Sequence, residues 1–504
     1  MKKVQKIVKN KIFLLIILSV IVFSCKKFLD QKPISVLSTG NAYNSSKDIE
    51  NALVGAYSIF YQEYYIWDNV LLSDVRSDNA YAGGGGDAAI VPYDLVNIAP
   101  GNERMYADWS QLYTGIGRCN IILDKINNVT DPDFETRKIQ IIGEVSFLRA
   151  FHYFQLVKAF GGVPLELHSN SADPEKTRLP RATEKEVYDQ IVSDLDVAIT
   201  NLPDYFEAGN PGVNKVKATK GAANALLAKV WAQRSDRDYS KVLTYCDAVI
   251  NSSAGYQLLS SYADLFDGDH YKNAESILEI PFIAGDPNLG NWGPQMFLAP
   301  EDGWQKYCVP SKDLVDDYEK EGDKIRLNAN IIFMKDIEWA DENWNPCQNE
   351  DIAIPFNYKQ KKPNDWASGD DYYLIRLADI ILLKAEADNE LGNLGDAADA
   401  LNKVRNRVNL EDISPISKEQ MRGAILNERR LELAFEGKRW DDLVRLKLAT
   451  TVMNNLNEVK YTCDNGEPSA PIPIHYNVTD QKWLAPIPQL EIDANPNLVQ
   501  NPGY

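Results

Sequence analysis

The sequence predicts a mainly α-helical protein, with a scaffold of tetratricopeptide-like helical repeats and one large irregular, loop-rich insertion. Apolar residues recur at helical spacing through most of 39–254 and 373–450, which predicts helices that bury one face. Two helix–turn–helix stretches, Ala225–Ile250 and Ala385–Val404, place small alanines where packed helices approach closely, as tetratricopeptide repeats do. Between the two helical parts, 255–372 is rich in Trp, Tyr, Pro, Gly, Asn and Asp, a composition typical of loops.

The expected elements follow from these patterns in chain order. Thr183 with Glu186, and Ser417 with Gln420, form capping boxes that mark helix starts. We expect 39–504 to form a single domain whose C-terminal tail, 451–504, is loop-like. Helices are expected at 42–60, 109–126, 139–160, 184–201, 222–233, 239–250, 373–391, 394–407 and 418–446, with an irregular segment at 68–104 and one short strand at 276–282.

The N-terminus has the features of a bacterial lipoprotein signal. Five lysines and no acidic residue precede the apolar run Ile12–Phe23, which is shorter than the roughly 20 residues that span a bilayer. The run leads to Ser24 and Cys25, and a small residue directly before a cysteine resembles the lipobox at which the cysteine is acylated. We predict a signal peptide over 1–24, lipidation of Cys25 and a lipidated tether over 25–38. An ordinary secretory signal is the alternative.

Charge and cysteine content narrow the class of protein further. The net charge of −19 at pH 7 disfavours binding to nucleic acid or to an anionic membrane surface. No segment after the N-terminal run is apolar enough to span a membrane. Five of the six cysteines remain when Cys25 is set aside, and none form a CxxC pair. A disulfide framework is therefore not expected, although one bridge is possible, and most cysteines should be small buried apolar residues.

Motifs for catalysis and metal binding are largely missing from the sequence. The four histidines are not at metal-ligand spacing, and HExxH, GxSxG and GxxxxGK[ST] do not occur. Asp264, Asp267 and Asp269 surround Gly268 and could bind Ca²⁺. Their spacing departs from the EF-hand loop, and a solvated acidic turn is the simpler interpretation. We therefore predict no catalytic residue and no cofactor, with Ca²⁺ left as a possibility.

A set of short motifs occurs in order along nearly the whole chain. They are CKKFLD at 25–30, WSQLYTGIGRCN at 109–120, RAFHYFQLV at 149–157, FGGVPL at 160–165, RAT at 181–183, RLAD at 376–379, AEA at 385–387, ERRLELAFEG at 428–437, RWDDL at 439–443, PIP at 486–488 and QNPGY at 500–504. In this order and at this spacing they resemble the SusD/RagB family of Bacteroidetes surface lipoproteins.

This resemblance has implications for fold, partner and function. It implies a largely α-helical SusD-like fold with four tetratricopeptide-like units, and a SusC-like TonB-dependent transporter as partner. Members of the family sit as a lid on that outer-membrane barrel and bind oligosaccharide or peptide. The expected protein is lipid-anchored in the outer membrane and faces the cell exterior. Its expected function is to capture a glycan and deliver it to the transporter without catalysis.

The candidate ligand-binding residues lie in two irregular regions. A sugar has apolar C–H faces and polar edges, so its site calls for flat aromatic surfaces beside short polar groups. A single tryptophan is more often a core residue, but the loops of the second region look too polar to bury all of theirs. The candidates are Asp74, Arg76, Asp78, Asn79, Tyr81, Tyr106 and Trp109 in the first region, and Trp292, Trp304, Tyr307, Trp339, Trp344 and Trp366 in the second.

The charged stretch 428–440 is expected to be structural. Glu428, Glu432 and Glu436 are spaced by four residues and therefore share one face of a helix. They could be catalytic carboxylates, but ion pairing is the expected arrangement, because buried pairs of this kind specify packing. The expected partners are Arg429, Arg430 and Arg439 on the same stretch, or Arg149 and Arg376 from other helices.

Three other functions remain open from the sequence. A glycoside hydrolase would need two carboxylates about 5 Å or about 6.5–9.5 Å apart across a cleft, and sequence does not give distances. A peptide-binding capture protein like RagB would keep the transport role and change the ligand class. A scaffold that braces the transporter without binding any ligand is the third alternative.

Overall fold

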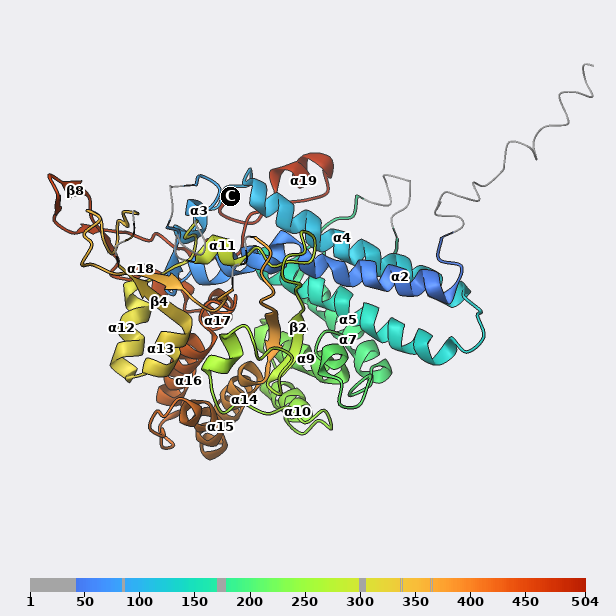
Figure 1. Cartoon of the computed structure of the whole chain (residues 1–504). Helices are drawn as coiled ribbons and strands as arrows, with labels where there is room; N and C mark the ends of the chain where they lie inside the picture. Colours follow the sequence, from blue (N-terminus) through green and yellow to red (C-terminus); the bar gives the residue numbers. More distant parts are fainter. Residues whose placement is uncertain are drawn as a thin grey trace, which may run out of the picture.

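The computed structural model describes residues 42–83, 87–169, 178–298, 305–335, 337, 339–362, 364 and 366–504. It is mainly α-helical, as predicted, and its long helices pack in one continuous series, each on the next (Figure 1). The series is α2 (Ser46–Tyr57), α4 (Glu103–Lys125), α5 (Glu135–Phe160), α7 (Glu184–Asn201), α9 (Lys220–Gln233), α10 (Tyr239–Ile250), α14 (Leu377–Leu391), α15 (Leu394–Arg407) and α16 (Lys418–Leu433).

The two halves of this helical scaffold join across the insertion. Helix α10 ends at Ile250 and α14 begins at Leu377, yet the two helices pack directly on each other. Beside them, strand β2 (Ser276–Ile280) pairs antiparallel with β6 (Tyr372–Arg376). The insertion therefore leaves the scaffold and returns to it at nearly the same place.

Local signals in the sequence place the helix ends correctly. Both predicted capping boxes are present: the side chain of Thr183 accepts a hydrogen bond from the backbone N–H of Glu186, and that of Ser417 from Gln420. These bonds satisfy N–H groups that have no partner inside the helix. Helix α5 ends at Gly161, whose φ of 73° is accessible to glycine at little cost.

The helices approach one another closely because small residues line their contacts. Helix α9 is buried along most of its length, and its contact positions are mainly alanines. Between α4 and α5, a Cβ at Gly115 would lie 2.5 Å from Nε2 of His152, so only glycine fits there. Among the described residues, no helix is long and apolar enough to cross a membrane.

One predicted helix begins later than expected. Residues 373–376, assigned to the helix 373–391 from their apolar pattern, belong to strand β6 (Tyr372–Arg376), and α14 starts only at Leu377. All five residues of β6 are buried, so they show no alternation of apolar and polar residues. A short apolar run of this kind fits a buried strand as well as a buried helix, and the pairing with β2 decides between them.

The predicted helix 418–446 is interrupted. Helix α16 ends at Leu433, and α17 (Arg439–Arg445) begins after a turn in which Phe435 and Gly437 have φ of 64° and 69°. The backbone N–H groups of Phe435 and Gly437 both donate to the carboxylate of Asp74, at 2.8 and 2.7 Å. A side chain from far away in the sequence therefore replaces the helical hydrogen bonds of this turn.

The insertion 255–372 contains more regular structure than its composition predicts. The elements it adds between β2 and β6 are α11 (Pro294–Phe297), β3 (Val309–Pro310), α12 (Lys312–Glu321), α13 (Lys324–Asn330), β4 (Ile331–Met334) and β5 (Ile354–Asn357). Strand β3 pairs with β1 (Ala80–Tyr81), and β4 pairs with β5. A π-helical turn at Tyr64–Asp68 leads into the predicted irregular segment 68–104, which itself contains a second π-helical turn at Leu71–Val75 and the short helix α3 (Val91–Asp94).

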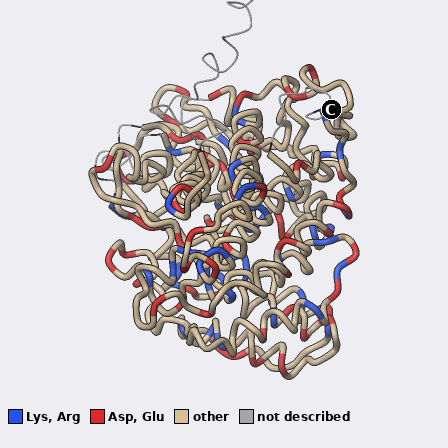
Figure 2. Tube along the Cα trace, turned by 90° about the vertical axis from the view of Figure 1, so that its right-hand side faces the viewer, with Lys and Arg blue, Asp and Glu red and all other residues tan. Residues whose placement is uncertain are grey.

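The charged stretch 428–440 forms part of a buried ionic framework. Glu428 and Glu432 both accept from Arg326, at 2.6 and 3.0 Å, and Arg376 donates to Glu432 and Glu436 at 2.6 and 2.7 Å. Figure 2 shows acidic and basic segments interspersed along the trace rather than gathered by sign. We define the ionic framework as Glu275, Arg326, Lys359, Arg376, Arg405, Arg407, Glu428, Glu432 and Glu436.

The predicted partners of these glutamates are right in one case and wrong in four. Arg376 pairs with them as expected, whereas Arg149 forms an ion pair with Asp194 at 2.6 Å. The arginines on the same stretch face other directions, because neighbouring positions on a helix do not share a face. Arg429 pairs with Asp379 and Asp442, and both Arg430 and Arg439 pair with Asp78.

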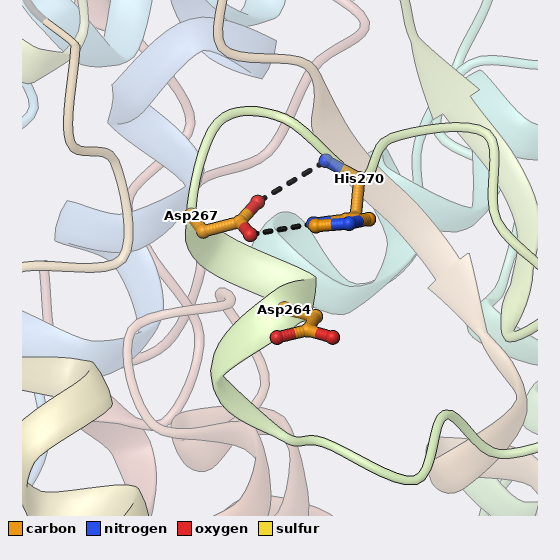
Figure 3. Close-up of side chains that lie close together, drawn as sticks. All are labelled: Asp264, Asp267 and His270. Atoms are coloured by element: carbon orange, nitrogen blue, oxygen red, sulfur yellow. Dashed lines mark hydrogen bonds and ion pairs between the residues drawn. The ribbon is translucent and has the colours of Figure 1, made fainter.

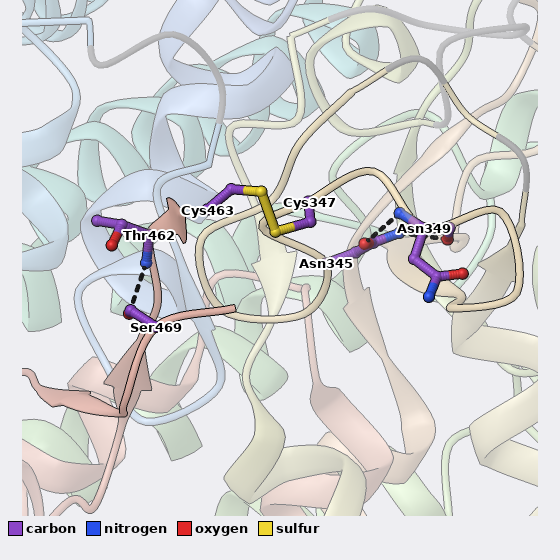
Figure 4. Close-up of a disulfide and its surroundings, with 6 residues drawn as sticks. All are labelled: Asn345, Cys347, Asn349, Thr462, Cys463 and Ser469. Carbon is purple, nitrogen blue, oxygen red and sulfur yellow. Dashed lines mark hydrogen bonds between the residues drawn. A yellow bond between two sulfur atoms is a disulfide. The ribbon is translucent and has the colours of Figure 1, made fainter. Parts of the chain in front are cut away.

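The tail carries a small arm that a disulfide joins to the insertion. We call 457–475 the C-terminal arm; in it β7 (Val459–Lys460) pairs with β10 (Ile472–Pro473), and β8 (Cys463–Asp464) with β9 (Glu467–Pro468). Cys463 is bonded to Cys347, which lies 116 residues earlier (Figure 4). The single bridge that the cysteine count allowed is therefore present. Cys119, Cys246 and Cys308 are free and buried, as expected.

Candidate ligand-binding surface

Most candidates of the first region lie inside the protein. The five residues from Asp74 to Tyr81 in that set have exposed fractions of 7% or less. Asp74 holds the turn after α16, and Arg76 donates to the carbonyl oxygens of Lys482 and Leu484. Asn79 donates to Asp74 at 2.8 Å and accepts from Arg430 at 3.0 Å. These side chains are occupied by the protein itself, so they are not available to a ligand in this arrangement.

The electrostatics of this segment agree with a structural role. Burial raises the pKa of Asp74 to about 6, although Asn79 and two backbone N–H groups oppose that shift. Burial alone would also raise the pKa of Asp78, but Arg430 and Arg439 hold it below its ordinary value. Asp78 is therefore an ionised carboxylate held between two arginines, of which Arg430 also pairs with Asp313 and Asp317, and it has no free edge for a sugar.

The last two candidates of the first region lie on α4. Trp109 is buried, and its ring packs against Tyr113 and Phe160, both 5.0 Å away between ring centres. Its edge lines a surface groove of about 490 Å³ between α4 and helix α19 (Gln489–Ala494), together with Glu166 and Glu491. Tyr106 is 38% exposed. Among the described residues, no ring contact joins Tyr106 or Trp109 to an aromatic side chain of the second region.

The candidates of the second region form a connected set around one buried ring. Trp67, which the sequence analysis did not single out, stacks on Tyr307 at 5.7 Å with an angle of 22° between the rings. The same ring contacts Trp292 edge-on at 6.1 Å, and the guanidinium of Arg104 lies 4.4 Å from its centre. Trp67 and Tyr307 are both buried, whereas Trp292 is partly exposed. The buried indole thus packs against two rings, of which Trp292 reaches the surface.

Two further tryptophans continue this set along the insertion. Lys306, next to Tyr307, places its ammonium 5.7 Å from the ring of Trp339 and donates to the carboxylate of Asp341 at 3.1 Å. Trp339 and Trp344 are partly exposed and pack on the small apolar cluster under β4 and β5. Strands β4 and β5 therefore give these loop residues a rigid support.

Trp366 is joined to the same loops through the backbone. Asn291, next to Trp292, forms an isolated antiparallel bridge with Ser368, with N–H···O distances of 2.8 and 2.9 Å. Trp366 lies two residues before Ser368, has φ of 69° and is 39% exposed. A tryptophan at positive φ on the surface is uncommon, and such positions cluster at functional sites.

We call Trp292, Tyr307, Trp339, Trp344 and Trp366 the aromatic cluster; Trp67 contacts the first two of these rings, and a small apolar cluster carries Trp339 and Trp344. Polar side chains lie near the aromatic cluster. One of them is Asp341, whose carboxylate accepts a hydrogen bond of 2.6 Å from the hydroxyl of Tyr81, a candidate of the first region. Burial and the charge of Asp341 raise the pKa of Tyr81, so its hydroxyl stays protonated and acts as a donor. Partly exposed rings offer the stacking surface that a sugar ring needs. Tyr81, Lys306 and Asp341 are buried and bond to one another, so they hold the loops in place rather than contact a ligand in this arrangement. Trp304 and Cys25 lie outside the described residues.

The possible calcium site differs from the expected one. The carboxylates of Asp264 and Asp267 approach the imidazole of His270, with one ligand atom from each within 4.8 Å of the others (Figure 3). Asp269 is not part of this group and pairs with Lys362 at 2.5 Å. Asp267 hydrogen-bonds to the imidazole at 2.6 Å and thereby raises the pKa of His270. The three side chains satisfy one another in part, and Ca²⁺ binding stays a prediction.

Comparison with known proteins places the chain in a family. Residues 348–504 match the model of the SusD family, and residues 27–231 match a model described as starch-binding associating with outer membrane. A SusD-like protein of Formosa agariphila is 29% identical over the whole of both chains. The starch-binding protein SusD of Bacteroides thetaiotaomicron is 26% identical over 81% of this chain and 80% of its own.

The solved structures agree with this result. A laminarin-binding SusD-like protein, 27% identical, superposes with a TM-score of 0.74 over 92% of this chain and all of its own. The shared architecture is the helical repeat scaffold described above, with little sheet. Together, the order of the helices, the two family matches and these relatives establish that the chain belongs to the SusD family.

Proposed function

We propose that this protein captures an oligosaccharide at the cell surface with the aromatic cluster and passes it, chemically unchanged, to a SusC-like TonB-dependent transporter. The observation that carries the proposal is the set of partly exposed indole rings in the insertion, of which Trp292 packs on buried Trp67, and Trp339 and Trp344 pack on the apolar cluster of β5. Stacking of rings on sugar C–H faces and hydrogen bonds to sugar hydroxyls are the interactions that such a surface supports.

The relatives favour a glycan over a peptide as ligand. The laminarin-binding SusD-like protein and the starch-binding protein SusD are both named for neutral glucans. The aromatic cluster also suits a neutral ligand, because its lysine and its carboxylate, Lys306 and Asp341, neutralise each other. A peptide ligand remains the alternative, and a glycoside hydrolase is the weaker one.

The location follows from the N-terminal signal and the family. We infer that acylated Cys25 anchors the protein in the outer membrane, with the folded part on the outside. Two or three acyl chains bind a bilayer firmly, because each buried methylene contributes about 0.8 kcal/mol. Changing Cys25 to alanine in cells should move the protein from the outer-membrane fraction to the soluble fraction. Recovery of that variant in the membrane fraction would leave the lipid anchor without support.

Binding is tested with laminarin and starch, the glycans of the two named relatives. Native gel electrophoresis with either polysaccharide in the gel should retard the wild-type chain lacking its signal peptide. Trp292→Ala and Trp366→Ala should each reduce the retardation, because each removes a ring from the aromatic cluster. Tyr205→Ala is the control, since Tyr205 is an exposed aromatic residue in the loop after α7.

The outcomes separate the possible functions. Binding that persists in both tryptophan variants would place the site elsewhere, with the groove beside Trp109 as the next candidate. Binding of short peptides but no glycan would change the ligand class and keep the capture role. Release of reducing ends from either polysaccharide at catalytic enzyme concentrations would identify a hydrolase instead.

A further inference from the structure

The C-terminal arm is held in place by contacts with the insertion rather than by a core of its own. Most residues of the arm between β7 and β10 are exposed, and each of its pairs has only two residues per strand. Two-stranded pairs of this size are not stable alone in water. The disulfide Cys347–Cys463 therefore holds in place a segment whose own short strand pairs are too weak to keep it in a fixed position.

The fixed position brings the arm beside one end of the aromatic cluster. The backbone N–H of Tyr461 donates to the carbonyl oxygen of Glu342 at 2.7 Å, and the ammonium of Lys460 lies 3.3 Å from the carboxylate of Glu342. Glu342 is two residues before Trp344, and Cys347 is three residues after it. The backbone hydrogen bond to Glu342 and the disulfide to Cys347 thus hold the arm at positions before and after Trp344 in the sequence.

Aromatic side chains from three elements gather at this junction. The ammonium of Lys312, at the start of α12, lies 5.4 Å from the ring centre of Trp344 and 5.2 Å from that of Tyr461. Phe333, on β4, packs edge-on against Trp344 at 6.4 Å and is 40% exposed. Since one ammonium lies over both rings, the indole and the phenol face the same lysine. Trp344 packs on the same small apolar cluster as Trp339, so this junction adjoins that part of the aromatic cluster.

We propose that the C-terminal arm adds a sugar-binding subsite, formed by Tyr461, Trp344 and Phe333, and that the ligand is an extended oligosaccharide chain long enough to reach from the aromatic cluster to the arm. The proposal rests on the proposed function and specifies the size of its ligand. A single sugar unit needs only one ring of such a surface. Here the rings come from two parts of the chain, the insertion and the C-terminal arm, and a disulfide holds the arm in place. Such a surface suits a ligand with several sugar units.

Chain length is the variable that tests this proposal. Calorimetry with short and long laminari-oligosaccharides, and with a matching series from starch, should give higher affinity for the longer chains. Tyr461→Ala should weaken binding of long chains about two- to tenfold and leave short chains nearly unchanged, because an aromatic contact of this kind has about that effect. Tyr461→Phe keeps the ring and should retain the affinity. Tyr205→Ala is again the control for loss of an exposed aromatic residue.

The disulfide gives a second, independent variant. Replacing both Cys347 and Cys463 by serine should remove the advantage of long chains as Tyr461→Ala does. Circular dichroism at the assay temperature should show the same helical content, although the thermal transition should fall, because the bridge no longer constrains the unfolded chain between residues 116 apart. This comparison separates a displaced arm from an unfolded protein.

Each outcome bears on a different statement. Equal loss for short and long chains in Tyr461→Ala, or no loss for either, overturns the arm subsite while binding by the wild type keeps the proposed function. If the wild type shows no preference for longer chains, the inference about ligand size is wrong. If neither glucan nor any of a panel of neutral and acidic polysaccharides binds the wild type, the proposed function and the subsite fall together.

Discussion

The ionic framework and the aromatic cluster differ in what their side chains leave free. In the ionic framework, buried carboxylates and guanidinium groups form ion pairs with one another, as Arg376 does with Glu432 and Glu436. In the aromatic cluster, the rings of Trp292 and Trp366 remain partly exposed while their supports are buried. Both regions contain residue types that occur in binding sites. The difference is that the framework satisfies its own charges, and the cluster keeps surface for a ligand.

The sharpest test of this comparison is the loss of one framework charge. Arg376→Met should lower the free energy of unfolding by about 3–5 kcal/mol, because it leaves buried carboxylates without their partner. Denaturant unfolding followed by circular dichroism measures the change. Arg422→Met is the matched control: it breaks a partly exposed ion pair with Glu390 and should cost less than about 1 kcal/mol. Similar effects for both would mean that the framework is no more than a set of surface pairs.

A smaller effect is expected where the scaffold helices touch. Gly115→Ala should destabilise the protein by about 1–3 kcal/mol, because the added methyl group meets the imidazole of His152. Gly117→Ala, on the same helix, has open space at that position and should be neutral or stabilise by up to about 1 kcal/mol. Thermal unfolding of the two variants gives the difference, and the opposite order would contradict the close helix contact.

We expect stability to depend on pH because the carboxyl group of Asp108 is buried. Burial, then the nearby Asp68, raises the pKa of Asp108 well above its ordinary value of 3.8. The folded state therefore holds this proton more tightly than the unfolded state, and the contribution to stability falls as pH rises above about 4. Asp108→Asn should gain stability relative to the wild type between about pH 5 and about pH 8, on the order of 1 kcal/mol or more. A constant difference across that range would refute the raised pKa.

The smallest change in stability is expected in the aromatic cluster. Trp366→Ala should alter the free energy of unfolding by no more than about 0.5 kcal/mol, since the ring is partly exposed and lies on a loop. The same substitution at buried Trp109 should cost about 3–5 kcal/mol. Glycan retardation should respond in the reverse order when measured below the melting temperature of both variants. Equal costs at the two positions would show that exposure does not distinguish ligand surface from framework here.

Much of the helical scaffold was predictable, because its signals are local. Helical spacing of apolar residues and the Thr183 and Ser417 capping boxes depend on residues a few positions apart. The strand at Tyr372–Arg376 and the turn after Leu433 were not, since each is decided by a partner far away in the chain. Asp74 fixes that turn across the whole fold, and no pattern near either residue indicates the contact.

The binding surface was predictable in part for the same reason. The abundance of tryptophan in the insertion is the basis for the candidate surface, which stays a prediction, and five of the six candidates there lie on described residues. The polar residues from Asp74 to Tyr81 have the composition of a sugar site, but their partners in 430–439 come from far away in the sequence. Trp67 and Tyr461 were missed. Trp67 sits in the aromatic run 64–67, which could have suggested it, whereas Tyr461 had no signal beyond the nearby Cys463.

The return of the insertion to its point of departure has an evolutionary consequence. Because β2 and β6 close its base and α10 meets α14 directly, the loops between them can lengthen or shorten without shifting a scaffold helix. Arg326 holds part of the insertion in place, because its ion pairs with Glu428 and Glu432 join α13 to the ionic framework. Insertions and deletions in related lineages should therefore accumulate in the loops before α12 and after β5 and be rare around Arg326. Such a division lets specificity for new nutrients arise while the fold is inherited unchanged.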